Sequence, residues 1–155
     1  MSLTIRPITP ADIPIVQAMA YNYNLDLNPD ETKREAVQRW IVSVCRKTQT
    51  GDHFFWLACV EESIIGFASC YLHTNPFTQE TLGFIEDFYL VPASRGQGYA
   101  QKLANIAFSE LQKRGASKIQ LDVLATNSKA LQFWQKLGLT IHHHVLNMPL
   151  GDAQH

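Results

Sequence analysis

The chain has 155 residues, of which 46% are hydrophobic, 17% charged and 10% aromatic. This length corresponds to one ordinary domain that can bury a core without disulfides or metals. The composition excludes a disordered chain, a coiled coil and a collagen-like fibre. The formal net charge is −1, with 13 Lys and Arg against 14 Asp and Glu, which argues against a protein that coats nucleic acid or an anionic membrane.

The charges are unevenly distributed along the chain. Residues 1–91 hold six basic and eleven acidic side chains, a net charge of −5. Residues 92–155 hold seven basic and three acidic side chains, a net charge of +4. Charge alone does not name a partner for either half.

Cysteine usage and the apolar runs indicate the compartment. Cys45, Cys59 and Cys70 all lie in apolar stretches, and their odd number and spacing fit neither a disulfide framework nor a zinc site. Residues 1–6 lack the pattern of a signal peptide, and the longest fully apolar run, 54–60, is too short to cross a bilayer. We therefore expect a cytoplasmic protein with buried thiols, no metal and no contact with a membrane.

Hydrophobic periodicity predicts the elements of the first part of the chain. A short strand over 3–8 precedes a helix over 10–22, which has Thr9 as its N-cap and a proline at its first position. A loop over 24–30 then leads to a helix over 31–47, whose apolar residues recur at helical spacing.

The rest of the chain alternates strand and helix patterns. The predicted elements are strands over 54–60, 64–73 and 81–91, a helix over 98–113, a strand over 118–124, a helix over 127–137 and a final strand over 139–150. Hairpin-linked strands followed by β-α-β crossovers predict a mixed α/β (α+β) sheet with helices on both faces. No repeat, linker or low-complexity tract interrupts the chain, so we predict a single domain over 1–155.

A glycine-containing loop is the most informative feature. In residues 90–100, a strand end passes through Gly96 and Gly98 directly into a helix. Glycine lets the backbone approach a ligand closely, and the first turn of a helix offers unpaired N–H groups and a positive dipole end. The loop therefore suits a phosphate, for which Arg95 would add a planar set of donors.

Two common phosphate-binding motifs fit this loop poorly. A P-loop needs Lys followed by Ser or Thr after its last glycine, and here Tyr99 and Ala100 follow. A dinucleotide fingerprint needs a third glycine where Gln101 stands, and its acidic residue would have to be Asp122, inside a predicted strand. A nucleotide-binding α/β domain therefore stays a less favoured alternative.

Two motifs carry a resemblance to a known family. Arg95, Gly98 and Ala100 stand in the order R-x-x-G-x-A just after a strand end, and residues 127–139 read N-x-x-A-x-x-F-W-x-x-x-G-L. The first resembles the acyl-CoA signature, and the second the N-x-x-A-x-x-F-Y-x-x-x-G-F signature, of the GCN5-related N-acetyltransferases, the GNAT superfamily. Residues 85–90 further resemble the fourth strand of the diamine (spermidine/spermine) acetyltransferase branch.

The resemblance implies a fold and a reaction. The fold would be a single GNAT domain with a mixed, mostly antiparallel, twisted sheet of six to seven strands and about four helices. The reaction would transfer the acetyl group of acetyl-CoA, as co-substrate, to a primary amine of a small cationic acceptor by direct attack in a ternary complex. Family members are often homodimers, so a homodimer is expected by analogy.

The resemblance also implies which residues bind acetyl-CoA. Backbone groups of one strand end would pair with the pantetheine arm, and the N–H of Leu90 would point at the thioester oxygen, as an oxyanion donor does. The implied cofactor-binding residues are Phe88, Tyr89, Leu90, Arg95, Gly96, Gln97, Gly98, Tyr99, Ala100, Gln101, Asn127, Ser128, Ala130 and Trp134.

The reaction needs a group that removes a proton from the acceptor, because an amine with a pKa near 10 is protonated at neutral pH. Glu86 is our first candidate for this base or for holding a water, and Asp87 is the second. Both are candidate substrate-binding residues. Neighbouring strand residues face opposite sides, so we expect only one of them to face the cleft. A structural ion pair is the alternative role for either carboxylate.

Trp134 departs from the family pattern, because the family usually has a Tyr there that protonates the leaving thiolate. An indole N–H donates hydrogen bonds but is no useful acid. Water, Tyr89 or Tyr99 would then protonate the sulfur, or no acid is needed. The missing Tyr supports a second hypothesis, a non-catalytic acyl-CoA-binding sensor or interaction module.

The loop between the first two helices lines the acceptor pocket in the family. By resemblance, Tyr21 and Asp26 would contact the acceptor, with Tyr23 and Asp30 nearby; a plain solvated loop is the alternative. A polyamine-like acceptor follows from the likeness to the diamine branch. A protein amine, an amino acid or an aminoglycoside are the alternatives.

Overall fold

The structure, a computed structural model, describes residues 2–27 and 34–151, without the side chains of residues 25–27. Two compact units divide the chain, Met1–Asp122 and Val123–His155. The first unit contains the sheet and three of the helices, and the second contains α4 (Ser128–Lys136).

A five-stranded sheet with the order β1-β2-β3-β4-β5 forms the centre of the first unit. Its strands are β1 (Leu3–Pro7), β2 (His53–Val60), β3 (Ser63–Thr74), β4 (Thr81–Leu90) and β5 (Lys118–Gln120). The first four pair antiparallel, and β5 pairs parallel to β4. A parallel neighbour requires a crossover, and a helix supplies it here. The predicted mixed, mostly antiparallel sheet is confirmed.

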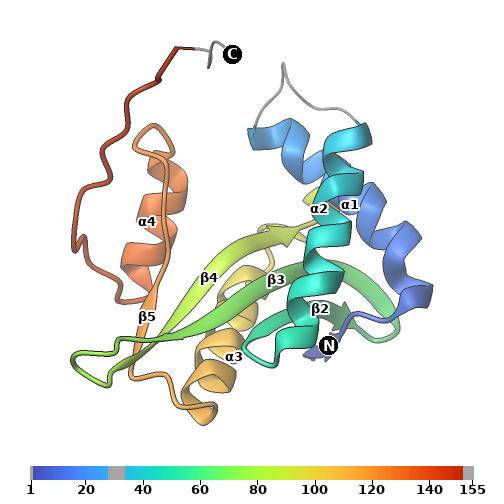
Figure 1. The fold of residues 1–155 in the computed structure, drawn as a ribbon. Helices are drawn as coiled ribbons and strands as arrows, with labels where there is room; N and C mark the ends of the chain where they lie inside the picture. The colour runs from blue at the N-terminus through green and yellow to red at the C-terminus, as the bar shows by residue number, and fades with distance from the viewer. Residues whose placement is uncertain (1, 28–33, 152–155) are drawn as a thin grey trace. The chain divides into compact units, whose positions relative to one another are not determined.

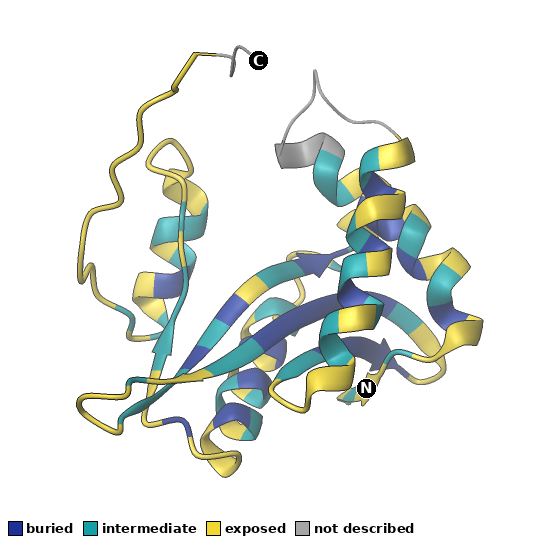
Figure 2. Cartoon of the chain, in the orientation of Figure 1, coloured by how far each residue is buried: buried dark blue, intermediate teal, exposed yellow. Residues whose placement is uncertain are grey.

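Helices cover both faces of this sheet (Figure 1). α1 (Ile13–Leu27) and α2 (Arg34–Lys47) lie side by side over one face, and α3 (Tyr99–Lys113) lies over the other. On the α1–α2 face, Val16 and Ile41 pack into a core cluster with Phe55, Phe67 and Tyr89. β2 is therefore buried along most of its length, and β3 is buried over its middle half (Figure 2).

The four predicted helices are confirmed with shifted ends. The first begins as a short 3₁₀ turn, Pro10–Asp12, capped by Thr9 as predicted, and α1 continues to Leu27, past the predicted end at residue 22. The predicted start of the second helix, over 31–33, lies outside the described residues.

The sheet is smaller than the predicted six to seven strands. The strand predicted over 118–124 ends at Gln120, and residues 139–151 form no helix or strand in the part of the chain that the structure describes. Leu146 is 91% exposed and Leu150 is 81% exposed in this segment. An alternating apolar pattern gives a strand only where a neighbouring strand satisfies its backbone hydrogen bonds, and sequence periodicity does not supply that neighbour.

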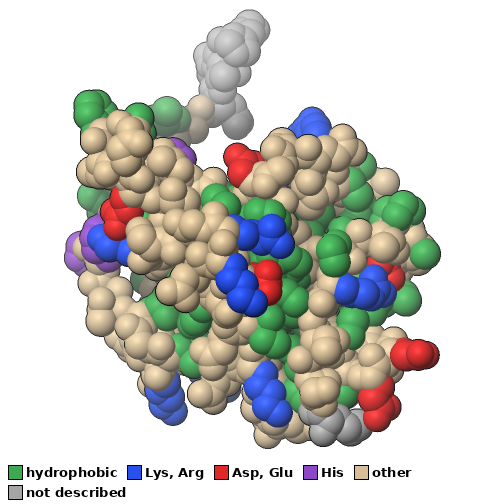
Figure 3. Space-filling view, turned by 90° about the horizontal axis from the view of Figure 1, so that it is seen from below, with side chains coloured by type: hydrophobic (Ala, Val, Ile, Leu, Met, Phe, Trp, Pro, Cys, Tyr) green, Lys and Arg blue, Asp and Glu red, His purple; other side chains and the backbone are tan. Residues whose placement is uncertain are grey.

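Figure 3 shows one face, on which Lys and Arg side chains lie singly or in small groups among apolar and uncharged ones. Among the described helices, none is long and apolar enough to cross a membrane.

Candidate active site

β4 carries the two predicted catalytic carboxylates at an irregularity of the sheet. Ser69 pairs with Asp87, whereas the next residue, Cys70, pairs with Ile85, so Glu86 is an extra residue that forms a β-bulge. The bulge interrupts the alternation of side chains, and Glu86 and Asp87 consequently line the same cavity. The prediction that only one of them faces the cleft relied on a regular strand, which β4 does not have at this point; which of the two faces a bound cofactor stays a prediction.

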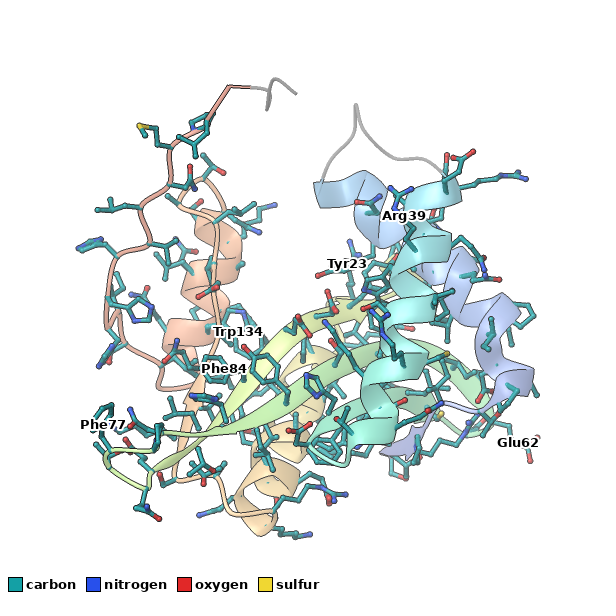
Figure 4. All side chains as sticks on the ribbon, in the orientation of Figure 1. Tyr23, Arg39, Glu62, Phe77, Phe84 and Trp134 are labelled. Carbon is teal, nitrogen blue, oxygen red and sulfur yellow. The ribbon has the colours of Figure 1, made fainter. Side chains whose placement is uncertain are left out.

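Asp87 is held by three neutral hydrogen-bond donors. Ser69 Oγ donates to its Oδ2 at 2.7 Å and Trp40 Nε1 donates to the same oxygen at 3.4 Å, while the Tyr23 hydroxyl donates to Oδ1 at 3.2 Å. Figure 4 shows Tyr23 beside the end of β4. Burial raises the pKa of Tyr23, and the charge of Asp87 raises it further, so Tyr23 stays a donor. No ion pair forms with Asp87 among the described residues.

Glu86 has different surroundings. Its Oε1 lies 3.7 Å from the ammonium of Lys47, at the end of α2, and the two side chains are 44% and 43% exposed. Such an exposed pair contributes little to stability. The extra residue of the bulge is therefore a solvent-connected carboxylate with a cation already beside it, whereas Asp87 has none.

Asp87 lies on the wall of two cavities. One, of about 140 Å³, lies between α2 and the sheet and contains both Glu86 and Lys47 on its wall; we call it the sheet cavity. The other, of about 280 Å³, lies between α1 and α2; we call it the helix cavity. Trp40 and Asp87 line both.

The end of β4 presents a backbone donor to the edge that faces away from β3. Val91 N–H donates to Ile65 O at 2.8 Å, and neighbouring backbone groups in a strand alternate in direction. The N–H of Leu90 consequently points away from β3. β5 pairs with β4 only over Leu82–Phe84, so this N–H lies beyond the last position where the two strands pair, as the predicted oxyanion donor requires.

The glycine loop has the geometry that its sequence predicts. Gly96 and Gly98 have φ angles of +76° and +83°, which other residues rarely adopt. Gly98 is the N-cap of α3, and the first intrahelical bond runs from Lys102 N–H to Gly98 O at 3.2 Å. The first N–H groups of a helix have no intrahelical acceptor, so Tyr99 and its two successors, Ala100 and Gln101, begin a helix N-terminus of the anion-binding type.

Arg95 fastens this loop to the strand. Its Nε donates to Leu90 O at 2.9 Å, and its guanidinium carbon lies 5.4 Å from the centre of the Tyr89 ring. Gln97 likewise donates from its side chain to Ala93 O at 3.0 Å. The role of Arg95 at a phosphate stays a prediction, and the structure adds an anchoring role that the sequence does not reveal.

The remaining predicted site residues lie elsewhere. Tyr21 is 39% exposed on α1. Asp26 lies in the last turn of α1, with its side chain outside the described part, and Asp30 is also outside the described residues. Phe88 lies on β4, half-buried, next to Asp87.

Four predicted cofactor-binding residues belong to the second unit, which is described by itself. Asn127 is the N-cap of α4, and its Oδ1 accepts a hydrogen bond from Ala130 N at 3.1 Å. Ser128 is the first residue of the helix, and Trp134 is buried, with its ring 4.8 Å from that of Phe133. The capping role of Asn127 follows from its position; its contact with a cofactor stays a prediction.

Sequence reasoning missed Ser69 and Lys47, and it placed Trp40 only in the core or the cleft wall. Ser69 and Trp40 donate to Asp87, and Lys47 pairs with Glu86. The role of Ser69 could have been predicted, because a polar residue inside a buried apolar run usually has a buried hydrogen-bond partner. Nothing in the sequence indicates that the end of α2 lies over β4.

Three relatives found by comparison with known proteins are all acetyltransferases by name. The chain is 33% identical over 85 residues to mycothiol acetyltransferase of Renibacterium salmoninarum, covering 54% of this chain and 25% of that protein. It is 31% identical over 97 residues to the ribosomal protein bS18-alanine N-acetyltransferase of Haemophilus ducreyi, covering 61% and 63%. It is 29% identical over 75 residues to the mouse thialysine N-epsilon-acetyltransferase, covering 48% and 44%. The chain thus spans less than two thirds of each of these relatives.

Solved structures share the fold. A transcriptional regulator from Bacillus halodurans superposes with a TM-score of 0.79 over 96% of this chain and 100% of that chain, at 23% sequence identity. The sequence model of the Acetyltransferase (GNAT) family matches residues 17–139, which is most of the chain. The chain therefore belongs to the GNAT acetyltransferase family.

Proposed function

We propose that the protein transfers the acetyl group of acetyl-CoA to the primary amine of a small cationic acceptor, such as a polyamine-like or another small amine. The observation that carries this proposal is the Asp87 carboxylate, which lines two cavities and is held by three neutral donors. A partly buried charge with neutral partners favours an opposite charge close by. An ammonium group on the acceptor would supply that charge.

The cofactor side of the proposal rests on the glycine loop. Two glycines with positive φ lead into the N-terminus of α3, an arrangement that suits the pyrophosphate of acetyl-CoA. The GNAT match over 17–139 includes residues of both units, which supports our proposal that they belong to one domain. Asn127, Ser128, Ala130 and Trp134 are then proposed cofactor contacts, by the family motif.

The residues of the site suggest a direct transfer. Asp87 would hold the acceptor ammonium, and the solvent-connected Glu86 would take one proton and pass it to water. The free amine attacks the thioester carbon and the C–N bond forms; as the C–S bond breaks, the nitrogen loses its second proton to water, which leaves the neutral amide. The Leu90 N–H would donate to the oxygen that becomes negative. The CoA thiolate then takes a proton from water or from a tyrosine.

The acceptor class needs a separate argument, because the relatives' names point to different acceptors. They name a ribosomal protein, mycothiol and thialysine. A protein or amino-acid amine is therefore the alternative acceptor. Trp134, at the position of the family's usual Tyr, favours a second candidate function, acyl-CoA sensing without turnover.

The test is release of free CoA thiol from acetyl-CoA in the presence of a panel of primary amines. We expect amine-dependent release by the wild type, loss of that release in Asp87→Asn, and unchanged binding of acetyl-CoA in this variant. Glu62→Gln is the matched control, because Glu62 lies in the β2–β3 turn, away from Tyr23 (Figure 4). Tight binding of acetyl-CoA without amine-dependent release would instead favour the sensor.

A further inference from the structure

An aspartate–histidine pair stands at the start of β2. His53 Nδ1 lies 2.8 Å from Asp52 Oδ1, and the Thr50 hydroxyl donates to the same carboxylate oxygen. The hydrogen bonds from Thr50 and then from His53 lower the pKa of Asp52, so this carboxylate is ionised and acts only as an acceptor. The neutral imidazole of His53 therefore carries its hydrogen on Nδ1 and its lone pair on Nε2.

The imidazole ring is also held at its face. It stacks on the Tyr71 ring with 5.3 Å between the ring centres and 22° between the planes, and Tyr71 stacks on Phe84 at 4.8 Å. The three rings come from directly paired positions of β2, β3 and β4. A ring that is held through Nδ1 and through one face presents Nε2 in a fixed direction, as a general base requires.

His53 borders the cavity that contains the catalytic candidates. It lies on the wall of the sheet cavity, as do Glu86 and Asp87. Burial raises the pKa of Tyr71, and the charge of Glu86 raises it further, so Glu86 lies near the ring on which His53 stacks. The side chain of His53 is 27% exposed, so a proton on this ring can leave to solvent.

The proposed reaction has a proton to remove from this cavity. The acceptor ammonium loses two protons in total, the CoA sulfur takes up one, and the other must reach the solvent. A carboxylate is a weak base towards an ammonium group, whereas a neutral imidazole is a stronger base that works near neutral pH. An imidazolium at His53 would have the ionised Asp52 beside it, which stabilises its charge.

We propose that His53 is a base of the acetyl transfer, whose Nε2 takes the acceptor's proton from Glu86, directly or through one water, and releases it to solvent. The ammonium N–H bond breaks with its electron pair left on nitrogen, Glu86 is protonated, and the proton then forms the Nε2–H bond of an imidazolium. Loss of that proton to water restores both side chains. Asp52 and Thr50 act as positioning residues. This inference rests on the proposed acetyl transfer and names the proton acceptor that follows Glu86.

The first test removes the ring and then supplies it from solution. His53→Ala should lower kcat by about tenfold or more, while the KM for the amine and the Kd of acetyl-CoA change by less than about twofold. Added imidazole should restore part of the lost rate in proportion to its concentration. Thiazole, a ring of the same size and much weaker basicity, should restore none. His73→Ala on β3 is the matched control, because His73 is exposed.

The second test keeps the ring and changes the group that holds it. Asp52→Asn removes the carboxylate that fixes the tautomer, and we expect kcat to fall by about threefold or more. Asp52 is 55% exposed, so the variant should fold, which thermal unfolding checks. ¹⁵N NMR of the histidine rings reports the tautomer of the wild type, with His53→Ala to assign the signal. A neutral His53 with its hydrogen on Nε2, or an unchanged kcat in Asp52→Asn, would overturn the inference.

The outcomes separate this inference from the function on which it rests. Amine-dependent thiol release that falls in His53→Ala and returns with imidazole, but not with thiazole, supports both. Release that His53→Ala leaves unchanged, or a loss that imidazole does not restore, overturns the inference and leaves the acetyltransferase proposal intact. A wild type without amine-dependent release contradicts the proposed function itself, and His53 then has no such proton to accept.

Discussion

Glu86 and Asp87 are neighbours in sequence with opposite electrostatic surroundings. Glu86 lies beside the ammonium of Lys47 and is 44% exposed, whereas Asp87 accepts from Ser69, Trp40 and Tyr23. A fixed carboxylate suits the binding of a cation, and a solvent-connected one suits the transfer of a proton to water. Substitution of Glu86 and substitution of Asp87 are therefore expected to have different effects on the reaction.

Replacing Glu86 by Gln should reduce turnover and leave acetyl-CoA binding unchanged. The amide keeps the shape of the side chain but cannot accept the proton, and loss of a general base costs about 10²–10⁴-fold in rate. The measurement is kcat at saturating amine, together with the Kd of acetyl-CoA. An unchanged kcat would remove Glu86 from the mechanism.

Gly66 on β3 controls the position of Leu90. A Cβ at residue 66 would overlap the carbonyl oxygen of Tyr89 and lie 3.0 Å from the Cα of Leu90. Gly66→Ala should therefore push the end of β4 away from β3, lower the free energy of unfolding by about 1–3 kcal/mol and weaken acetyl-CoA binding. Calorimetric melting and binding measure both effects. Gly151→Ala, where a Cβ meets open space, is the control and should change neither.

At the scale of elements, an ion pair joins β1 to the start of the first helix. Arg6 donates twice to Asp12, from Nη1 at 2.7 Å and from Nη2 at 2.8 Å, and Asp12 also accepts from Thr9 N and Oγ1. The hydrogen bonds from Arg6, followed by those from Thr9, hold the pKa of Asp12 well below its usual range, although burial opposes them. This carboxylate consequently stabilises the folded chain only while it is ionised.

The Asp12→Asn variant should be less stable than the wild type by about 2 kcal/mol at pH 7. A depressed folded pKa stabilises the protein above the unfolded pKa of about 3.9. As the pH falls below about 4 and towards the folded pKa, the wild type loses this contribution, and the difference between the two proteins should shrink. Denaturant unfolding at pH 7, 5 and 3 measures it. A difference that stays constant down to pH 3 would contradict the pairing.

The sequence predicts elements better than it predicts contacts between them. Helical spacing and the capping residue Thr9 are local, so α2, α3 and α4 are found to within a few residues. The loop with Gly96 and Gly98 is predicted because positive φ at two glycines is a local property. The bulge at Glu86 is not predicted, because it depends on how β3 and β4 pair. The donors to Asp87 come from three different elements, and no local pattern brings them together.

At the scale of the whole molecule, the charge is unevenly distributed along the sequence, in a way that fits the two proposed substrates. The half with net charge −5 contains Glu86 and Asp87, and the half with net charge +4 begins at the glycine loop. The opposite net charges of these two halves of the sequence would favour the proposed cationic acceptor and the anionic cofactor, respectively.

Salt should consequently weaken the binding of acetyl-CoA. The Debye length falls from about 10 Å at 0.1 M to about 3 Å at 1 M ionic strength, so the Kd of acetyl-CoA should rise several-fold over this range. Calorimetry with increasing NaCl measures the slope. Acetyl-pantetheine, which lacks the phosphates, is the control and should bind with little dependence on salt. If the Kd values of acetyl-CoA and acetyl-pantetheine depended equally on salt, the basic residues of 92–155 would not be binding the phosphates.

The bulge also affects how the sequence of β4 should be aligned with the corresponding strand of homologous proteins. Glu86 is one residue more than the pairing of β3 with β4 requires, so a homologous strand that lacked it could keep the other paired positions, from Thr81 to Leu90. A gap of one residue at this point would then change the number of carboxylates without changing the fold. An acidic residue of β4 should accordingly be aligned with the residue of a homologue that has the same partner on the neighbouring strand. For Asp87 this partner is Ser69.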